Sequence, residues 1–280
     1  MRLAIIGVGS IGSRHARNAK ALGHEVCLYD ADHRKAAPMA HELGLPGWSE
    51  SFDVFDGDAV LICTPASTHA AVAKRVLDTC GAVALFCEKP LALSVDDCEV
   101  FRTWPHPTTQ VGYMLRFHPA IRRMRAICPS PTGGGFYVDC DSREWPGSQY
   151  AEMMLELSHE LDLALSFGAP ACLNSSSKIA EHRATLWLGG AHMNWLVDLD
   201  DRCEHYLRHW MIGSSEDDGT LVRIHSRDEM GDEMYRDELA HFLDCAQRGV
   251  PTEVSFADGI RVLDVIAQAK EMAACQRSSQ

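Results

Sequence analysis

The sequence predicts an α/β domain with a parallel sheet, followed by an α+β domain with a mostly antiparallel, open-faced sheet. Three observations predict this division. Over roughly the first hundred residues, short apolar runs alternate with segments of helical periodicity. After about residue 118, strand-like segments separated by glycine turns replace that alternation. The length, 280 residues, exceeds one ordinary domain and suits two. We place the domains at 1–118 and 119–280, with the C-terminal helix in the second domain or packed back on the first.

The apolar runs of the first domain predict buried parallel strands, because a strand covered on both faces needs no polar alternation. These runs are 3–8, 25–29, 59–63, 82–87 and 109–113. Helical periodicity predicts a helix after each of the first four strands, at 11–22, 33–43, 68–79 and 94–103. Gly23 suits the end of the first helix, and Ser94 suits the N-cap of the last.

The second domain begins with a loop-like segment that contains three glycines, 130–135, followed by an alternating strand at 136–142. An amphipathic helix is predicted at 155–167, because Gly168 and Pro170 follow its last apolar position. Strands joined by glycine turns are expected over about 171–226. Two further helices are predicted at 233–248 and 256–275.

Charge and cysteine content narrow the class of partner. The formal net charge of −13 disfavours nucleic acid and anionic membranes as partners, and no apolar stretch is long enough to span a bilayer. The cluster Arg116, Arg122, Arg123 and Arg125 is either a solvated helix face or a site for a substrate anion. The 11 cysteines include no Cys-x-x-Cys pair, which favours free thiols in a reducing cytoplasm over disulfides or zinc. No export signal is visible at the N-terminus, so a cytoplasmic protein is expected.

The segment GVGSIG at 7–12 fits the pattern G-x-G-x-x-G between a buried strand and a helix, which predicts a Rossmann dinucleotide site. Gly7 permits the tight turn, Gly9 lets the backbone approach a diphosphate, and Gly12 lets helix and strand pack closely. The helix N-terminus favours the diphosphate charge. Asp30 follows the last glycine by eighteen positions and would accept hydrogen bonds from ribose hydroxyls, which favours NAD. Arg34 lies close to Asp30 in the sequence, and its positive charge leaves NADP as the alternative cofactor. The residues expected to contact the dinucleotide here are Gly7, Gly9, Ser10, Ile11, Gly12 and Asp30.

Six segments, in order along nearly the whole chain, resemble the glucose–fructose oxidoreductase / inositol dehydrogenase family (Gfo/Idh/MocA). They are GVGSIGSRHARN from residue 7, LICTPASTH at 61–69, CEKPLAL at 87–93, VGYMLRFHP at 111–119, ELSHELD at 156–162 and the run from MYRDELAHF at 234 to 273. The resemblance implies two domains with the active site between them. It also implies hydride transfer between the nicotinamide and a secondary alcohol or ketone of a sugar, sugar nucleotide or cyclitol, and a homodimer or homotetramer formed through the second domain's sheet.

The resemblance also implies roles for individual residues. Lys89 corresponds to the active-site lysine, which also contacts the cofactor, and His159 corresponds to the catalytic histidine. Further cofactor contacts are implied at Thr64, Pro65, His69 and Glu88. Substrate contacts are implied at Arg116, with Tyr113 and Trp145 as further candidates for which packing is the alternative.

The chemistry requires a proton acceptor and a nearby positive charge. When hydride leaves a carbinol carbon, the hydroxyl proton must leave too, and a histidine with an ordinary pKa of roughly 6.5 can accept it. An ammonium beside the same oxygen stabilises the developing alkoxide. The family pattern D-x-G-x-H is absent here, so either Glu156 or Asp162 is expected to orient His159. No metal is expected, because no H-E-x-x-H spacing is present.

Two alternatives to net oxidoreduction follow from the same residues. The segments REWPG at 143–147 and ELSHELD at 156–162 resemble a subgroup of this family that is associated with cell-surface sugars and sialic-acid-like compounds. That subgroup usually has a longer segment before the helix than the one between Gly147 and Leu155, so the resemblance implies a shortened substrate loop. One alternative is an enzyme that retains NAD and cleaves or epimerises a glycoside through transient oxidation. The other is a non-catalytic NAD-binding sensor or scaffold.

Overall fold

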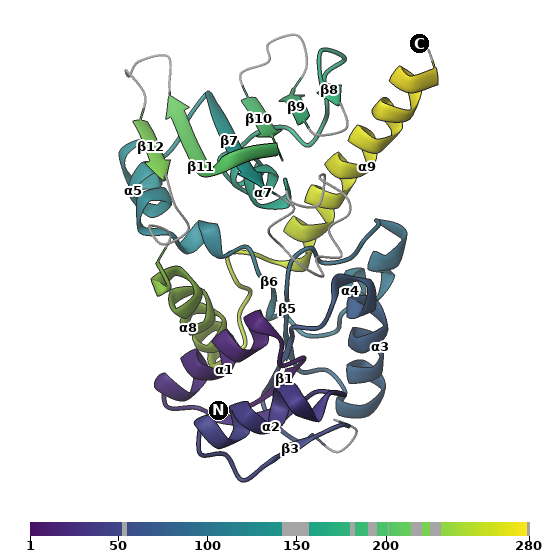
Figure 1. The fold of residues 1–280 in the computed structure, drawn as a ribbon, viewed down its shortest axis with the longest axis vertical. Helices are drawn as coiled ribbons and strands as arrows, with labels where there is room; N and C mark the ends of the chain where they lie inside the picture. The colour runs from purple at the N-terminus through teal and green to yellow at the C-terminus, as the bar shows by residue number, and fades with distance from the viewer. Residues whose placement is uncertain are drawn as a thin grey trace. The chain divides into compact units, whose positions relative to one another are not determined.

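The chain forms two compact units (Figure 1). Unit 1 comprises residues 1–114 and 235–260, and unit 2 comprises 115–234 and 261–280. The computed structural model describes residues 1–51, 55–141, 157–179, 183–189, 195–200, 202–213, 220–224 and 231–278.

Unit 1 is built on a six-stranded parallel sheet in the order β3-β2-β1-β4-β5-β6. Its strands are β1 (Arg2–Ile6), β2 (Glu25–Tyr29), β3 (Trp48–Ser49), β4 (Ala59–Ile62), β5 (Ala84–Cys87) and β6 (Thr109–Val111). The sheet confirms the predicted parallel α/β domain. Strand order reverses between β1 and β4, and open α/β sheets bind ligands beyond the carboxyl ends of strands at such a point.

Four helices of unit 1 follow the predicted alternation: α1 (Ser10–Ala21), α2 (His33–Glu42), α3 (His69–Cys80) and α4 (Glu99–Arg102). A further helix, α8 (Glu233–Arg248), was predicted within the second domain. The predicted helix at 94–103 is divided into a 3₁₀ turn at Asp96–Cys98 and the short α4. The N-cap of the turn is Val95 and not the predicted Ser94, although the Ser94 hydroxyl accepts the backbone N–H of Asp97 at 3.4 Å. Residues 235–260 group with unit 1, because Leu239, Phe242 and Leu243 of α8 pack into the core around β1 and β5.

Unit 2 is built on a mixed sheet in the order β12-β11-β7-β10-β9-β8. Its strands are β7 (Gly133–Asp141), β8 (Lys178–Ile179), β9 (Arg183–Leu188), β10 (Trp195–Asp200), β11 (Arg202–Gly213) and β12 (Thr220–Ile224). Only β7 and β10 pair in parallel among the described pairs, which confirms the mostly antiparallel sheet.

Helices α5 (Pro119–Ile127) and α7 (Ser158–Ser166) of unit 2 pack against strands of this sheet. A 3₁₀ turn at Met114–Phe117 leads into α5, and α7 packs against β7 and β10. Helix α9 (Phe256–Ser278) starts in unit 1 and continues in unit 2 from residue 261. Among the helices that the structure describes, none combines the length and apolarity that a bilayer crossing requires.

The segment 133–135, predicted as part of a loop, is instead the first part of β7. Its glycines pair with β10 and β11, and Trp195 lies opposite Gly134 in the ladder. A Cβ on Gly134 would lie 3.0 Å from the indole ring of Trp195 and 2.7 Å from the carbonyl oxygen of Met211. The glycines therefore make room for a neighbouring strand and its tryptophan, a requirement that resembles a loop signal in sequence.

Candidate functional site

The strand-to-helix bend between β1 and α1 excludes side chains at two of its glycines. Gly7 has φ +93°, and a Cβ there would lie 2.7 Å from the carbonyl carbon and oxygen of Cys63. A Cβ on Gly12 would overlap the carbonyl oxygen of Gly7. At Gly9 the situation is the opposite, because an added Cβ would meet no atom within 4 Å. The bend is thus closed on its protein side and open at the glycine that is predicted to face a ligand.

The start of α1 carries no competing negative charge. Its N-cap is Gly9, no side chain caps the helix, and no acidic residue lies in the first turn. The N–H groups of a first helical turn lack intrahelical partners and carry partial positive charge. The open space at Gly9 and these N–H groups fit the diphosphate of a dinucleotide.

Asp30, at the end of β2, braces this bend from within unit 1. Its carboxylate accepts the backbone N–H of Val8 at 2.6 Å and that of Asp32 at 2.8 Å. An ionised carboxylate has about four acceptor positions, so two bonds leave capacity for ribose hydroxyls. Asp30 therefore holds the glycine bend in place in addition to its predicted contact with the ribose.

Arg34, which leaves the NADP question open in the sequence, is paired with Asp32. Its Nε and Nη2 atoms each donate to one carboxylate oxygen of Asp32 at 2.9 Å. These side-chain bonds, with the bond from the Arg34 backbone N–H, lower the pKa of Asp32 to about 2. The guanidinium is therefore engaged beside a permanent negative charge, which favours NAD over a 2′-phosphate.

The turn Glu88–Lys89–Pro90 follows β5, the strand beside β4. Glu88 is 8% exposed, and its carboxylate accepts the backbone N–H of Lys89 at 3.1 Å. A Cβ on Gly112 would lie 2.7 Å from Glu88 Oε2, so the carboxylate is seated against a position that glycine leaves empty. The Lys89 side chain is half-buried, and the Lys89–Pro90 peptide bond is cis.

Three residues around this turn were not identified from the sequence: His15, Gly112 and Tyr235. His15 Nε2 lies 2.7 Å from Glu88 Oε1. Tyr235 of α8 lies under the guanidinium of Arg14, 4.3 Å from the ring centroid, and burial raises its pKa to about 12. His15 lies three positions after Gly12, on the helix face that packs on the sheet, and a titratable residue at such a position is the one signal that the sequence offers.

Thr64 and Pro65 directly follow Cys63, beyond the end of β4. The Thr68 hydroxyl lies 2.8 Å from the Thr64 hydroxyl and donates to the carbonyl oxygen of Pro65 at 2.7 Å. His69 is buried, and its two ring nitrogens face the carbonyl oxygens of Thr64 and Pro90. The structure thus brings Thr64, His69 and the Glu88–Pro90 turn together within unit 1, while their contacts with cofactor remain predictions.

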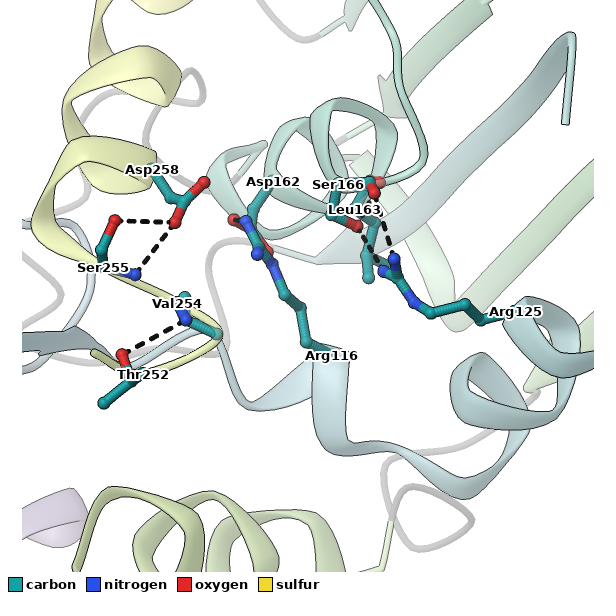
Figure 2. Close-up of polar contacts among 9 residues, drawn as sticks. All are labelled: Arg116, Arg125, Asp162, Leu163, Ser166, Thr252, Val254, Ser255 and Asp258. Carbon is teal, nitrogen blue, oxygen red and sulfur yellow. Dashed lines mark hydrogen bonds and ion pairs between the residues drawn. The ribbon is translucent and has the colours of Figure 1, made fainter. Parts of the chain in front are cut away.

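In unit 2, His159 and Asp162 lie on α7, whose residues 158–165 are all buried. Four of these buried residues are polar: Ser158, His159, Glu160 and Asp162. Arg116 donates to Asp162 from Nε at 2.8 Å and from Nη2 at 2.5 Å, and Figure 2 shows the two side chains pointing toward one another. The side chain of Asp162 is 1% exposed and that of Arg116 is 9% exposed. Two residues predicted for different roles, substrate contact and histidine orientation, therefore form one buried ion pair.

Two further arginines hold α7. Arg208 of β11 forms an ion pair with Glu160, and burial raises the pKa of Glu160 although the arginine opposes that shift. Arg125 of α5 donates to the carbonyl oxygen and the hydroxyl of Ser166 at the C-terminal end of the helix (Figure 2). A cation at a helix C-terminus complements the helix dipole. Of the four-arginine cluster, Arg116 and Arg125 thus bind α7.

Of the remaining predicted residues, Tyr113 lies within the described part of the chain, and Trp145 and Glu156 do not. Tyr113 is fully buried in unit 1. His118 caps α5 by accepting the backbone N–H of Ala120 at 3.2 Å, and burial lowers its pKa. Within the described ranges, no group of three or more His, Cys, Asp or Glu residues is arranged to hold a metal ion.

The sequence of the first domain is similar to that of a known protein family and of curated proteins. Residues 1–103 match a family described as an oxidoreductase family with an NAD-binding Rossmann fold. The scyllo-inositol 2-dehydrogenase (NAD(+)) of Bacillus subtilis is 35% identical over 130 residues, which are 43% of this chain and 37% of that protein. The UDP-N-acetylglucosamine 3-dehydrogenase of Acidithiobacillus ferrooxidans is 31% identical over 59% of this chain and 53% of that protein. The chain thus spans about half or less of the length of these curated relatives.

Solved structures resemble the chain over nearly its full length. A probable dehydrogenase from Thermotoga maritima has a TM-score of 0.82 at 19% identity, covering 99% of this chain and 97% of that chain. The UDP-N-acetylglucosamine 3-dehydrogenase from A. ferrooxidans has a TM-score of 0.78 at 22% identity, covering 98% of each chain. At these identities the likeness shows the shared fold. What the comparisons show for this chain is that residues 1–103 match the Gfo/Idh/MocA oxidoreductase family's NAD-binding Rossmann domain and that the two curated relatives are similar over part of their length.

Proposed function

We propose that the protein is an NAD-dependent oxidoreductase that transfers hydride between nicotinamide and a secondary alcohol or ketone of a sugar, sugar nucleotide or cyclitol. The observation that carries the proposal is the glycine bend, which is closed at Gly7 and Gly12, open at Gly9 and followed by an uncapped helix without acidic residues. The substrate class comes from the names of the curated relatives, which act on scyllo-inositol and on UDP-N-acetylglucosamine.

The chain's own residues supply binding and selectivity for the dinucleotide. The bend and the first turn of α1 bind the diphosphate, and Asp30 binds the adenosine ribose while it also holds the bend. Asp32 keeps Arg34 paired, so the site favours NAD over NADP. Thr64, Pro65 and Glu88 are proposed to contact the nicotinamide end.

Bound NAD supplies the hydride acceptor in oxidation and the hydride donor in reduction. The protein's part in this step is to move a proton and to stabilise charge at the reacting oxygen. We assign proton transfer to His159 and charge stabilisation to the ammonium of Lys89. Arg116 is assigned to the substrate together with its ion-pair partner Asp162. Either Glu156 or Asp162 is proposed to orient His159. Asp162 would do so while its carboxylate also accepts two hydrogen bonds from Arg116.

The test is substitution of Lys89 by methionine, which keeps the length of the side chain and removes its charge. We expect NADH binding, measured by fluorescence titration, to change less than threefold, and turnover with an active sugar or cyclitol to fall by at least about a hundredfold. Lys74→Met is the matched control, because Lys74 is an exposed lysine of unit 1 paired with Asp78. Unchanged turnover in the Lys89 variant would remove the assignment.

The substrate is to be found with a panel of cyclitols, sugars and sugar nucleotides, read by NADH absorbance. Tight NADH binding with no turnover across that panel would instead favour a sensor or scaffold, and product without net NADH change would favour transient oxidation. Neither alternative gains support from the named relatives, so neither is proposed here.

We also propose a compartment and an assembly for the protein, from the described residues and the sequence. Cys63 and Cys87 are buried free thiols, and burial raises the pKa of both. Such unreactive thiols, with the sequence content of 11 cysteines, support a cytoplasmic protein. We further propose that unit 2 binds the substrate and that its sheet forms a homodimer or homotetramer. Light scattering during gel filtration would measure the mass, and a monomer would contradict the assembly.

A further inference from the structure

Two buried histidines, His15 and His69, contact the turn that carries Lys89. His15 contacts the side chain of Glu88, and His69 contacts the backbone carbonyl oxygen of Pro90. His15 of α1 is fully buried, and its Nε2 lies 2.7 Å from Glu88 Oε1. A carboxylate oxygen only accepts, so Nε2 carries the hydrogen of this bond. The imidazole ring also lies edge-on to Phe86, with ring centroids 5.0 Å apart. His15 therefore fixes the side chain of the residue that precedes Lys89.

His69 contacts the other side of the same turn. It is the first residue of α3, and its Nδ1 lies 3.0 Å from the carbonyl oxygen of Pro90, the residue after Lys89. Its Nε2 lies 2.8 Å from the carbonyl oxygen of Thr64. One imidazole thus joins the loops that follow β4 and β5. Burial lowers the pKa of His69. A neutral imidazole has one N–H, so in that form His69 donates a hydrogen bond to one of the two carbonyl oxygens and only packs against the other.

Glu88 transmits the His15 contact to the backbone of Lys89. One carboxylate oxygen faces His15 and the other accepts the Lys89 N–H at 3.1 Å. The carboxylate has little room to move away, because Gly112 leaves only the space of a missing Cβ beside it. Nδ1 of His15 has no hydrogen-bond partner among the described residues, and its ring is inaccessible to ligand, so His15 acts on the site only through Glu88.

We propose that His15 and His69 are positioning residues that hold the Glu88–Lys89–Pro90 turn from both sides and thereby fix the position of the Lys89 ammonium. The inference rests on the proposed function for the role of Lys89. Positioning matters because a misplacement of about 1 Å can cost on the order of a hundredfold in rate. Neither histidine touches the reacting atoms in this proposal.

The test uses hydrogen–deuterium exchange, followed by mass spectrometry on peptides that contain residues 86–92, in the full chain. His15→Phe keeps an aromatic ring against Phe86 and removes the donor. We expect exchange in these peptides to speed up by about fivefold or more, while exchange in β1 and β4 stays the same. His69→Phe should act in the same way. Gly112→Ala should reproduce the effect without changing either histidine, since its Cβ displaces the Glu88 carboxylate.

Kinetics of the same variants separate positioning from binding. We expect kcat to fall by about tenfold or more, with the NADH dissociation constant within threefold of wild type. His15→Gln and His69→Gln retain an N–H donor and should recover most of the loss, and they also serve if a phenylalanine variant does not fold. His241→Phe is the matched control, because His241 is a histidine of unit 1 that bonds the backbone N–H of Glu253.

The outcomes distinguish this inference from the proposed function. Faster exchange throughout unit 1, or unchanged exchange at 86–92, would overturn the positioning role and leave both histidines as core residues. Local exchange as expected, together with a Lys89→Met variant of normal turnover, would retain the clamp on the turn and refute the proposed role of Lys89. Equal loss in the phenylalanine and glutamine variants would also contradict positioning by a donated hydrogen bond.

Discussion

Replacing Asp162 by asparagine should strongly destabilise unit 2, because it removes the negative charge from a buried ion pair with the guanidinium of Arg116. The pair is shielded from water, with side-chain exposures of 1% and 9%, and the guanidinium donates two hydrogen bonds at 2.8 and 2.5 Å. Removing one partner of such a buried pair costs about 3–5 kcal/mol. That is a large part of a domain stability of about 5–15 kcal/mol.

Differential scanning calorimetry is the primary assay, with hydrogen exchange of peptides from α7 to locate the effect. For a unit of this size, each kcal/mol corresponds to a shift of roughly 3 °C in Tm, so we expect a loss of about 10 °C. The double variant Arg116→Met with Asp162→Leu removes both charges and should lose much less than either single change. The control is Lys74→Met, which breaks an exposed pair and should change stability by less than about 0.5 kcal/mol.

Two results would refute this reasoning. A shift below 3 °C for the asparagine variant would mean that the pair is hydrated or not formed. A double variant as unstable as the single ones would mean that the side chains matter by packing and not by their charges.

Three other perturbations address the dinucleotide site and the pH response. Gly12→Ala should weaken NADH binding by at least about tenfold in a fluorescence titration, because its Cβ overlaps a backbone carbonyl of the bend. Asp32→Asn keeps an N-cap for α2 and frees Arg34, so the ratio of NADPH to NADH affinity should rise on the order of tenfold in the same assay. His118→Asn should reduce the loss of Tm between pH 7.5 and 5.5. Burial lowers the pKa of His118, so its contribution to stability is present above about 6.5 and is lost as pH falls below that value, whereas asparagine accepts from Ala120 without titrating.

Each of these has a control or a contrary result. Gly47→Ala should leave NADH binding unchanged, because an added Cβ there meets no atom within 4 Å, and equal losses at both positions would contradict the steric argument. An unchanged cofactor ratio in the Asp32 variant would show that Arg34 does not reach the 2′ position. An acid-induced loss of Tm as large in the His118 variant as in wild type would assign the titration to other histidines whose pKa burial lowers, such as His69.

Much of unit 1 and of its dinucleotide bend could be predicted because the controlling patterns are local. Buried parallel strands are read from runs of a few apolar residues, and the bend from three glycines and an aspartate within a short stretch. The partners of individual side chains were not predictable, since pairing links residues far apart in the sequence. Arg116 and Asp162 are 46 positions apart, and His15 and Glu88 are 73 positions apart.

By itself, the sequence predicted the parallel domain and the mostly antiparallel second sheet, and it supplied the candidate residues for the proposed chemistry, whose roles stay predictions. Only the tertiary structure decided that α8 belongs to the core of unit 1, that three glycines begin β7, and that Asp162 is bound to Arg116. The physical reason is that periodicity and turn residues act over a few positions, whereas a buried charge is stable only beside the partner that folding brings to it.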